Sequence, residues 1–501
     1  MARTPEAWRP STTRTIETRL DLPCLVTNPP RNGTPPHCFL REHPSDTLRH
    51  NPKSNVASRA VRSSYTALMN DRTERYCMTA RRVHSLVLLL VLTALITPVH
   101  SAEDLPRARP EAVGLSGPRL DRLTDVMQAY VDDGQLAGGV VIVARRGRVA
   151  YLESFGQRDR ESNSPMTTDA IFRIASQTKA IISTGVMLLQ EEGKLLISDP
   201  VGRYLPEFAR TQVAVAHEDG GYDIVPARGR ITIRQLLTHT SGVSYGSGPA
   251  NDRWEAAGIQ GWYFADRDEP VGDTISRLAS LPFDAHPGTQ WVYGYNTDIL
   301  GALIEVVSGQ PLDEFLQARI LDPLGMEDTH FYLPLEKVNR LATVYSAAGG
   351  GLERAPDPGH MVGQGAYVSG PRTSFSGGAG LLSTATDYAR FLQMTLNGGE
   401  LEDTRLLSRK TVELMTTNHL TDQAFRAGQG FGLGFSIVEN VGARGLPGSK
   451  GEYGWGGAYH STYWVDPTEE LVVVYLTQLI PAGGLDDQGR LRALIYQAIV
   501  D

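Results

Sequence analysis

The helix that the sequence predicts after residue 180 is apolar on almost every side. Ile182, Val186 and Leu189 share one helical face, while Ile181 and Leu188 carry the apolar surface around it. A surface helix keeps one polar face, so a helix of this kind must be covered from all sides. The chain is therefore expected to fold as a domain built around this central, buried helix.

The tetrad Ser176-Gln177-Thr178-Lys179 stands at the start of that helix. At a spacing of three residues the hydroxyl and the amine share one helical face. A serine hydroxyl is a poor nucleophile unless a neighbour accepts its proton, and a neutral amine, which burial favours, can do so. The helix N-terminus can also stabilise negative charge on a substrate. The alternative is an ordinary N-cap serine.

Residues 78–101 have the pattern of a secretory signal peptide. Arg81 and Arg82 precede an apolar run over 86–96, and small residues follow before Ala102. A run of about eleven residues is too short to span a bilayer, although an uncleaved membrane anchor remains an alternative. We expect an exported protein, periplasmic or secreted, with no stable membrane insertion after cleavage.

Residues 1–77 are rich in Arg, Pro, Ser, Thr and Asn and lack sustained apolar periodicity. Such a segment cannot bury enough apolar surface to offset the entropy of ordering, so we predict a disordered leader. Signal peptides lie at true N-termini. An alternative is therefore that translation starts at Met78 and that residues 1–77 are not made.

Charge and cysteine content limit the partners of the exported part. Removing residues 1–101 leaves 34 Lys/Arg and 49 Asp/Glu, a formal charge of −15, which argues against nucleic acid as a partner. Cys24, Cys38 and Cys77 all precede the cleavage site. The exported part therefore has no disulfide, thiol nucleophile or cysteine zinc ligand.

No cofactor or metal is expected. The histidines of the exported part are not at metal-ligand spacing, and no Walker sequence occurs. The glycines of 430–434 lack the spacing and the strand-helix setting of a dinucleotide site.

The order of elements predicts an α/β (α+β) protein. Residues 138–144 and 149–151 read as an antiparallel hairpin after a helix, and the C-terminal region returns to strands and a final amphipathic helix. We predict one antiparallel sheet with flanking helices, built from 105–195 and 376–501. Residues 196–375, punctuated by Pro and Gly, are predicted to form a mostly helical insertion.

A rival hydrolase motif lies at Gly242-Val243-Ser244-Tyr245-Gly246, which matches the Gly-x-Ser-x-Gly elbow of α/β-hydrolases. His460 comes late enough in the chain to complete a triad. The elbow needs a strand before it and a helix after it, whereas a helix-like segment, 233–238, precedes this one. We therefore favour Ser176 as the nucleophile.

Six motifs follow one another in a family order. They are Ser176-x-x-Lys179, Leu236-Leu237-Thr238-His239-Thr240-Ser241-Gly242, Trp291-Val292-Tyr293-Gly294-Tyr295, Pro323-Leu324-Gly325-Met326, Gly377-Gly378-Ala379-Gly380-Leu381 and Trp455-Gly456-Gly457-Ala458. This order resembles serine β-lactamase-like proteins, which include penicillin-binding-protein-like hydrolases. The resemblance covers residues 105–499; it extends to class C β-lactamases and is stronger to family VIII carboxylesterases.

The resemblance implies a β-lactamase/transpeptidase-like fold with Ser176 as the acyl-forming nucleophile. Lys179 and Tyr293 would share proton transfer, since an adjacent lysine cation favours the phenolate. The backbone amides of Ser176 and Ala458 would bind the oxyanion. The alternative for Tyr293 is a buried structural aromatic.

Departures from the β-lactamase pattern favour esters. Trp455 and Tyr295 stand where those enzymes carry a strand lysine and an asparagine that contact a β-lactam carboxylate and amide. An aromatic and glycine lining suits uncharged esters instead. The predicted pocket residues are Tyr295, Trp455, Gly456, Gly457 and His460. For His460 a structural role is the favoured alternative, and His239 is expected to tie down its loop by hydrogen bonds.

The sequence thus predicts a carboxylesterase that acts on a small-molecule ester or amide through an acyl-serine intermediate. β-Lactamase and D-amino peptidase activities would use the same groups. A non-catalytic protein of the same fold that binds peptidoglycan or another ligand is a further alternative, although binding alone needs no Ser-Lys-Tyr set. The sequence does not predict an oligomeric state.

Overall fold

The computed structural model describes residues 105–347, 350–421 and 423–501. The predicted leader, 1–77, and the predicted signal peptide, 78–101, lie outside the described residues. Within the described ranges, none of the helices has the length and apolar character needed to cross a bilayer.

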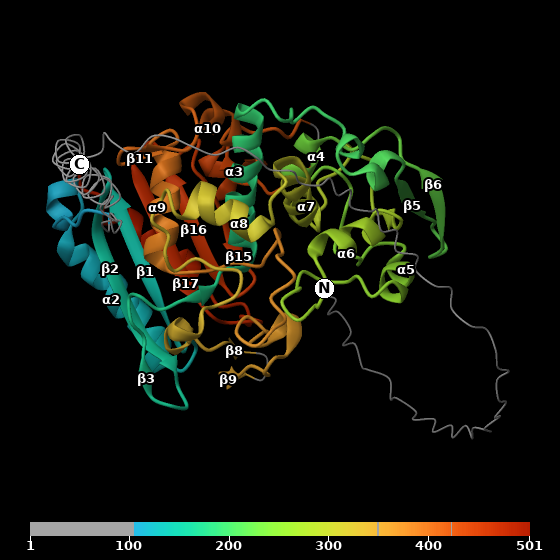
Figure 1. The fold of residues 1–501 in the computed structure, drawn as a ribbon. Coiled ribbons are helices and arrows are strands. Elements are labelled where there is room, and N and C mark those ends of the chain that lie inside the picture. Colours follow the sequence, from blue (N-terminus) through green and yellow to red (C-terminus); the bar gives the residue numbers. More distant parts are fainter. Residues whose placement is uncertain (1–104, 348–349, 422) are drawn as a thin grey trace, which may run out of the picture. The chain divides into compact units, whose positions relative to one another are not determined.

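An eight-stranded antiparallel sheet forms the centre of the fold, in the order β13-β14-β15-β16-β17-β1-β2-β3. Its strands are β1 (Gly138–Arg145), β2 (Arg148–Asp159), β3 (Ser164–Pro165), β13 (Gln429–Phe431), β14 (Ser436–Val438), β15 (Tyr453–Gly457), β16 (Ser461–Asp466) and β17 (Leu471–Thr477). β1 pairs with β17, so that the early and late parts of the domain share one sheet (Figure 1). This confirms the predicted antiparallel sheet.

Both faces of the sheet centre are buried because β1 is apolar at every second position on each side. Val140 and Ile142 face one core cluster, and Val141 and Val143 face another. Helices α3 (Thr178–Glu191) and α9 (Ala385–Leu396) contribute to the first cluster. Helices α2 (Gly117–Asp132) and α12 (Asp487–Tyr496) cover the opposite face. The result is a sheet between two layers of helices (Figure 1).

Helix α3 is the central, buried helix that the sequence predicted. Every residue from Thr178 to Leu189 is buried. Gly185 lets the helix approach its neighbours closely, since a Cβ there would lie 3.1 Å from Ile304 and 3.2 Å from Phe315. Helix α3 is therefore packed between the sheet and the insertion, and its first turn, which carries Lys179, is buried.

The predicted hairpin over 138–144 and 149–151 is confirmed, and the C-terminal region returns to strands as expected. β1 and β2 pair across the turn at Arg146, and β16 pairs with β17. The Thr384 side chain accepts the backbone N–H of Asp387 and caps α9.

The insertion contains helices and, among its strands, a three-stranded sheet that was not predicted. Its helices are α4 (Ile233–Leu237), α5 (Asn251–Ala256), α6 (Val271–Leu278), α7 (Asn296–Ser308) and α8 (Leu312–Leu316). The small sheet joins β5 (Gln212–Ala216) to β6 (Tyr222–Pro226) and, in parallel, to β7 (Pro282–Phe283). The sequence signal was weak because β5 buries only Val213 and Ala214 and pairs with a strand far along the chain.

The remaining elements are short. They are β4 (Phe172–Arg173), β8 (Tyr345–Ser346), β9 (Glu353–Arg354), β10 (Leu382–Ser383), β11 (Glu400–Leu401), β12 (Thr404–Arg405), α10 (Arg409–Met415), α11 (Val441–Arg444) and single turns of 3₁₀ or π helix. Of these, the β4–β10 pair matters for the site because β4 leads directly into the turn that carries Ser176 and β10 pairs with β4.

Candidate active site

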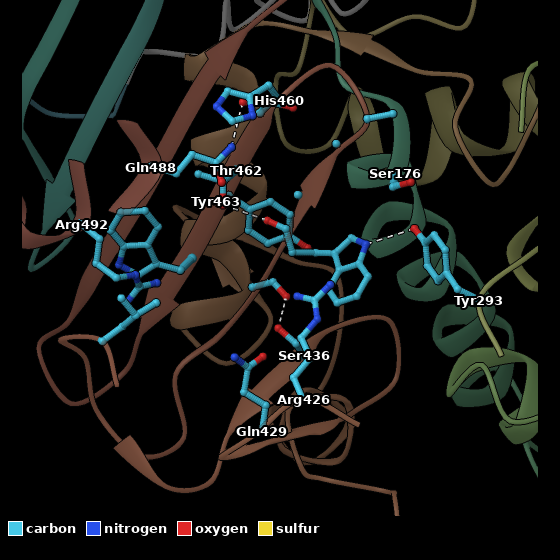
Figure 2. A pocket seen from close by; sticks show the side chains of 18 of the residues that line it. Ser176, Tyr293, Arg426, Gln429, Ser436, His460, Thr462, Tyr463, Gln488 and Arg492 are labelled. Atoms are coloured by element: carbon cyan, nitrogen blue, oxygen red, sulfur yellow. Dashed lines mark hydrogen bonds between the residues drawn. The ribbon is translucent and has the colours of Figure 1, made fainter. Parts of the chain in front are cut away.

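Ser176 lies in a single 3₁₀ turn, η2 (Ala175–Gln177), between β4 and α3. Ala175 has a φ of 42°, a left-handed conformation that costs energy in a residue with a side chain. Gln177, not Ser176, is the residue before α3, and no side chain caps the helix. Ser176 is therefore not an N-cap serine. Its side chain is directed into a cavity (Figure 2).

Lys179 points back at Ser176 and is only 2% exposed. Its Nζ donates to Ser176 Oγ at 3.2 Å, to the Tyr245 hydroxyl at 3.1 Å and to the Gly378 carbonyl at 2.7 Å. A carbonyl oxygen can only accept, so one N–H is committed to Gly378. When the amine is neutral, its remaining N–H can bond Tyr245 and its lone pair can face Ser176. This geometry permits Lys179 to take the serine proton.

The backbone of Gly378 is held in place by a buried carboxylate. Asp298, on α7, accepts the Gly378 N–H at 2.9 Å and the Ser376 hydroxyl at 2.6 Å. Burial raises the pKa of Asp298, whereas the nearby Lys179 opposes this. A Cβ at Gly378 would lie 2.3 Å from the carboxylate, so only glycine allows this approach. The Gly377–Leu381 motif thus positions the amine through its backbone.

Tyr245 was not predicted as a site residue. Its hydroxyl accepts a hydrogen bond from Lys179 Nζ, and burial raises the pKa of Tyr245 well above its ordinary value, which keeps the phenol neutral. Its ring also lines the cavity. The available signal was its position three residues after Gly242, the end of the Leu236–Gly242 motif.

Ser244 does not occupy a nucleophile elbow. Helix α4 precedes this segment where the elbow needs a strand, and Ser244 is 4% exposed. Its hydroxyl accepts the backbone N–H of Gly246. The structure therefore contradicts the rival α/β-hydrolase interpretation.

Tyr293 presents its ring, not its hydroxyl, to Lys179. The amine lies 4.6 Å from the ring centroid, a cation–π contact. The Tyr293 hydroxyl accepts a hydrogen bond from Trp455 Nε1 at 3.1 Å (Figure 2). Both Tyr293 and Ser176 line the cavity. Within the described part of the chain the phenol proton has no acceptor, so it can be donated to a substrate.

His239 supports the Tyr293 ring. It is buried, with ring centroids 4.7 Å apart, and it also contacts Trp291 and Phe431. Burial first, and then the charge of Lys179, lower the pKa of His239 well below its ordinary value. Its side-chain Nδ1 has no hydrogen-bond partner among the described residues. Contrary to the expected hydrogen bonds, this side chain acts by packing.

Tyr295 lies outside the cavity wall, contrary to the prediction. It is fully buried, stacks on Trp254 and meets the edge of Tyr245. The helix α7 begins directly after it, so its side chain turns toward the core of the insertion. Tyr295 therefore backs Tyr245 and does not meet a ligand.

The end of β15 lies against the turn that carries Ser176. A Cβ at Gly457 would be 2.5 Å from the Ile174 carbonyl, so glycine permits this close approach. Gly456, Gly457 and Ala458 all line the cavity together with Ser176. The structure thus brings together the two backbone positions proposed as oxyanion donors.

His460 borders the cavity, but its ring is tied to α12. Its Nε2 lies 2.6 Å from Asp487 Oδ1, and Asp487 Oδ2 accepts the Tyr475 hydroxyl at 2.7 Å. Asp487 is fully buried. This arrangement favours the structural alternative, in which His460 fixes the turn between β15 and β16.

The cavity has a volume of about 840 Å³. Its wall near Ser176 is aromatic and comprises Tyr245, Trp262, Trp291, Tyr293 and Trp455. In the described ranges no group of His, Cys, Asp or Glu side chains is arranged to hold a metal ion. The site therefore combines a serine hydroxyl, a lysine and two tyrosines beside an aromatic wall.

We expect Tyr293→Phe to lower kcat about 10²-fold, because a positioned proton donor contributes about that factor or more. Tyr245→Phe should cost about tenfold, since it removes one hydrogen bond to the amine and keeps the ring. Steady-state kinetics on one ester, with KM compared, measures both. A larger loss for Tyr245→Phe than for Tyr293→Phe would give the proton-transfer role to Tyr245.

Known proteins are similar to this chain in sequence and fold. The beta-lactamase family model matches residues 123–497. An uncharacterised protein of Mycobacterium tuberculosis is 36% identical over 73% of this chain and 92% of its own length. Esterase EstB of Burkholderia gladioli is 34% identical over 74% and 93%.

A solved structure shows the same fold. EstCE1, described as a hydrolase with promiscuous acyltransferase activity, is 30% identical to this chain with a TM-score of 0.65, over 75% of this chain and 98% of its own. Together with the Ser176–Lys179 geometry, the family match identifies the protein class. The chain belongs to the beta-lactamase family and is a serine hydrolase.

Proposed function

We propose that the protein is a carboxylesterase that works through an acyl-Ser176 intermediate. The observation that carries this proposal is the contact between Lys179 Nζ and Ser176 Oγ at 3.2 Å, inside an aromatic cavity. The similarity to EstB supports ester over other acyl substrates.

In the proposed reaction, Ser176 Oγ attacks the ester carbonyl while Lys179 takes its proton. The oxyanion of the tetrahedral intermediate lies against the backbone amides of Ser176 and Ala458. The intermediate then collapses, and the leaving alcohol receives a proton from Tyr293 or Lys179. Water attacks the acyl-serine by the same steps in reverse order, which releases the carboxylic acid and restores Ser176.

Trp455 leaves β15 without the cation that β-lactamases carry on this strand. The indole occupies the place of a strand lysine and points its N–H at Tyr293 at 3.1 Å, so this strand position offers no cation to a β-lactam carboxylate. Without the strand lysine, the site has lost one contact that selects a β-lactam in β-lactamases.

We expect the protein to hydrolyse a short-chain p-nitrophenyl ester with a higher kcat/KM than a chromogenic cephalosporin, since β15 lacks the strand cation that contacts a β-lactam carboxylate in β-lactamases. Parallel assays with the wild type and Ser176→Ala measure both activities.

The other outcomes separate the alternatives. Faster cephalosporin turnover would make the protein a β-lactamase. Turnover of a D-alanyl peptide alone would make it a peptidase. Inactivity on all three, with no labelling by a fluorophosphonate probe, would favour a non-catalytic binding protein.

We further propose that the enzyme acts after export. Only the sequence pattern of residues 78–101 supports this. Edman sequencing of the native protein should give an N-terminus at Ala102, and recovery of peptides from 1–77 would contradict a start at Met78.

A further inference from the structure

The cavity wall carries a positive charge excess although the predicted exported part is strongly acidic. Among the described residues, the cavity is lined by three guanidinium groups, Arg426, Arg444 and Arg492, and by one carboxylate, Glu452. Residues 102–501 carry a formal charge of −15. A concave, low-dielectric site of one sign concentrates ligands of the opposite sign.

Two of these arginines share the one carboxylate as an ion-pair partner. Arg444 lies 2.8 Å and Arg492 lies 2.7 Å from Glu452 Oε1, and both pairs are largely buried. They hold α11 and α12 against β15 and make little charge available to a ligand.

Of the three arginines that line the cavity, Arg426 is the one with no ion pair to a carboxylate among the described residues. It lies three residues before β13. Its Cζ is 4.7 Å from the Trp455 ring centroid and 5.5 Å from that of Phe425. Stacking on aromatic faces holds the planar group in place and leaves its N–H donors free. Arg426 is thus an oriented, uncommitted donor.

The Trp455 indole lies between Arg426 and Tyr293 and contacts both. Trp455 contacts Arg426 with its face and Tyr293 with its Nε1. Gln429 lines the same part of the cavity, and its side-chain amide makes no hydrogen bond within the described residues. Figure 2 shows Arg426 and Gln429 on the opposite side of the cavity from Ser176. A ligand that reaches from Ser176 past the indole ends at these two groups.

We propose that the cavity accepts esters that carry a carboxylate, with Arg426 as the residue that binds it and Gln429 as a second donor. The proposal rests on the esterase function proposed above and names its substrate class. It replaces the sequence expectation of an uncharged ester, because the cation comes from a loop that the motifs did not place in the pocket. A guanidinium and a carboxylate make paired, charge-assisted hydrogen bonds.

The test compares kcat/KM for anionic esters and neutral partners of the same size. One pair carries the charge on the acyl chain, as 4-nitrophenyl hydrogen adipate against 4-nitrophenyl methyl adipate. The other carries it on the leaving group, as the butyrate ester of 3-hydroxybenzoate against that of 3-hydroxybenzamide. The ratio within a pair cancels any general loss of activity.

In Arg426→Met we expect the anionic-to-neutral ratio to fall about tenfold in at least one pair, and the affected pair tells which side carries the carboxylate. Arg426→Lys should retain part of the preference. Arg409→Met, which removes the same charge from exposed α10, should leave the ratio at the wild-type value. An Arg426→Met ratio equal to that of the wild type in both pairs would overturn the proposal.

Calorimetric binding of the same four esters to Ser176→Ala separates the two proposals. If the wild type hydrolyses none of the esters, the esterase function fails. The binding ratio still decides the role of Arg426: a preference for the anion that is lost in Ser176→Ala/Arg426→Met supports it, and equal binding by both variants rejects it.

Discussion

The Ser176→Ala variant is expected to lose at least about 10⁴-fold in kcat, because removing a serine nucleophile eliminates the covalent route. Ser176 is the hydroxyl that bonds Lys179 at 3.2 Å and faces the cavity. The folded state should be nearly unchanged, since one small side chain in a turn is removed. Kinetics on a p-nitrophenyl ester and labelling by a fluorophosphonate probe measure the loss.

Ser244→Ala is the matched control. Ser244 is buried and bonded to a backbone N–H, so this variant should keep its labelling and its turnover within about threefold of the wild type. Retained labelling of Ser176→Ala together with loss in Ser244→Ala would overturn the assignment of the nucleophile.

The Lys179→Met variant is expected to lose about 10³-fold to 10⁴-fold in kcat. Methionine preserves most of the buried apolar stem, but no group then remains in place to take the Ser176 proton. The Gly378 carbonyl also loses its 2.7 Å donor, so the melting temperature should fall by a few degrees. Kinetics and thermal unfolding give the two effects separately.

Lys194→Met provides the control for this substitution. Lys194 follows α3 and is ion-paired with Glu192 on the surface, where a lost pair costs little. If Lys179→Met kept more than a tenth of the wild-type kcat, the base would have to be a group other than Lys179.

The architecture followed from the sequence wherever local periodicity decided the outcome. The apolar surface around Val186 predicted the buried helix α3, and alternation along 138–144 predicted β1. The small sheet of β5, β6 and β7 was missed because a parallel pairing of short strands has no local signal. Non-local pairings of this kind depend on the whole fold.

For the site, the motifs located the residues but not their contacts. Ser176, Lys179, Tyr293 and Trp455 all reach the cavity region, as the motif order implied. Which tyrosine oxygen meets the amine depends on side-chain direction, and this is why Tyr245 was missed. No motif contains Arg426, because a cation stacked on an indole needs no fixed sequence spacing.

The pairing of β1 with β17 also bears on how the sheet forms. Gly139 pairs with Thr477, and the end of β15, in the same sheet, packs against the turn that carries Ser176. Contacts between segments so distant in the chain form slowly, because the entropy of closing a long loop is lost before the contacts stabilise the fold. A chain that has not yet formed β17 lacks the strand that joins β1 to β16 in this sheet.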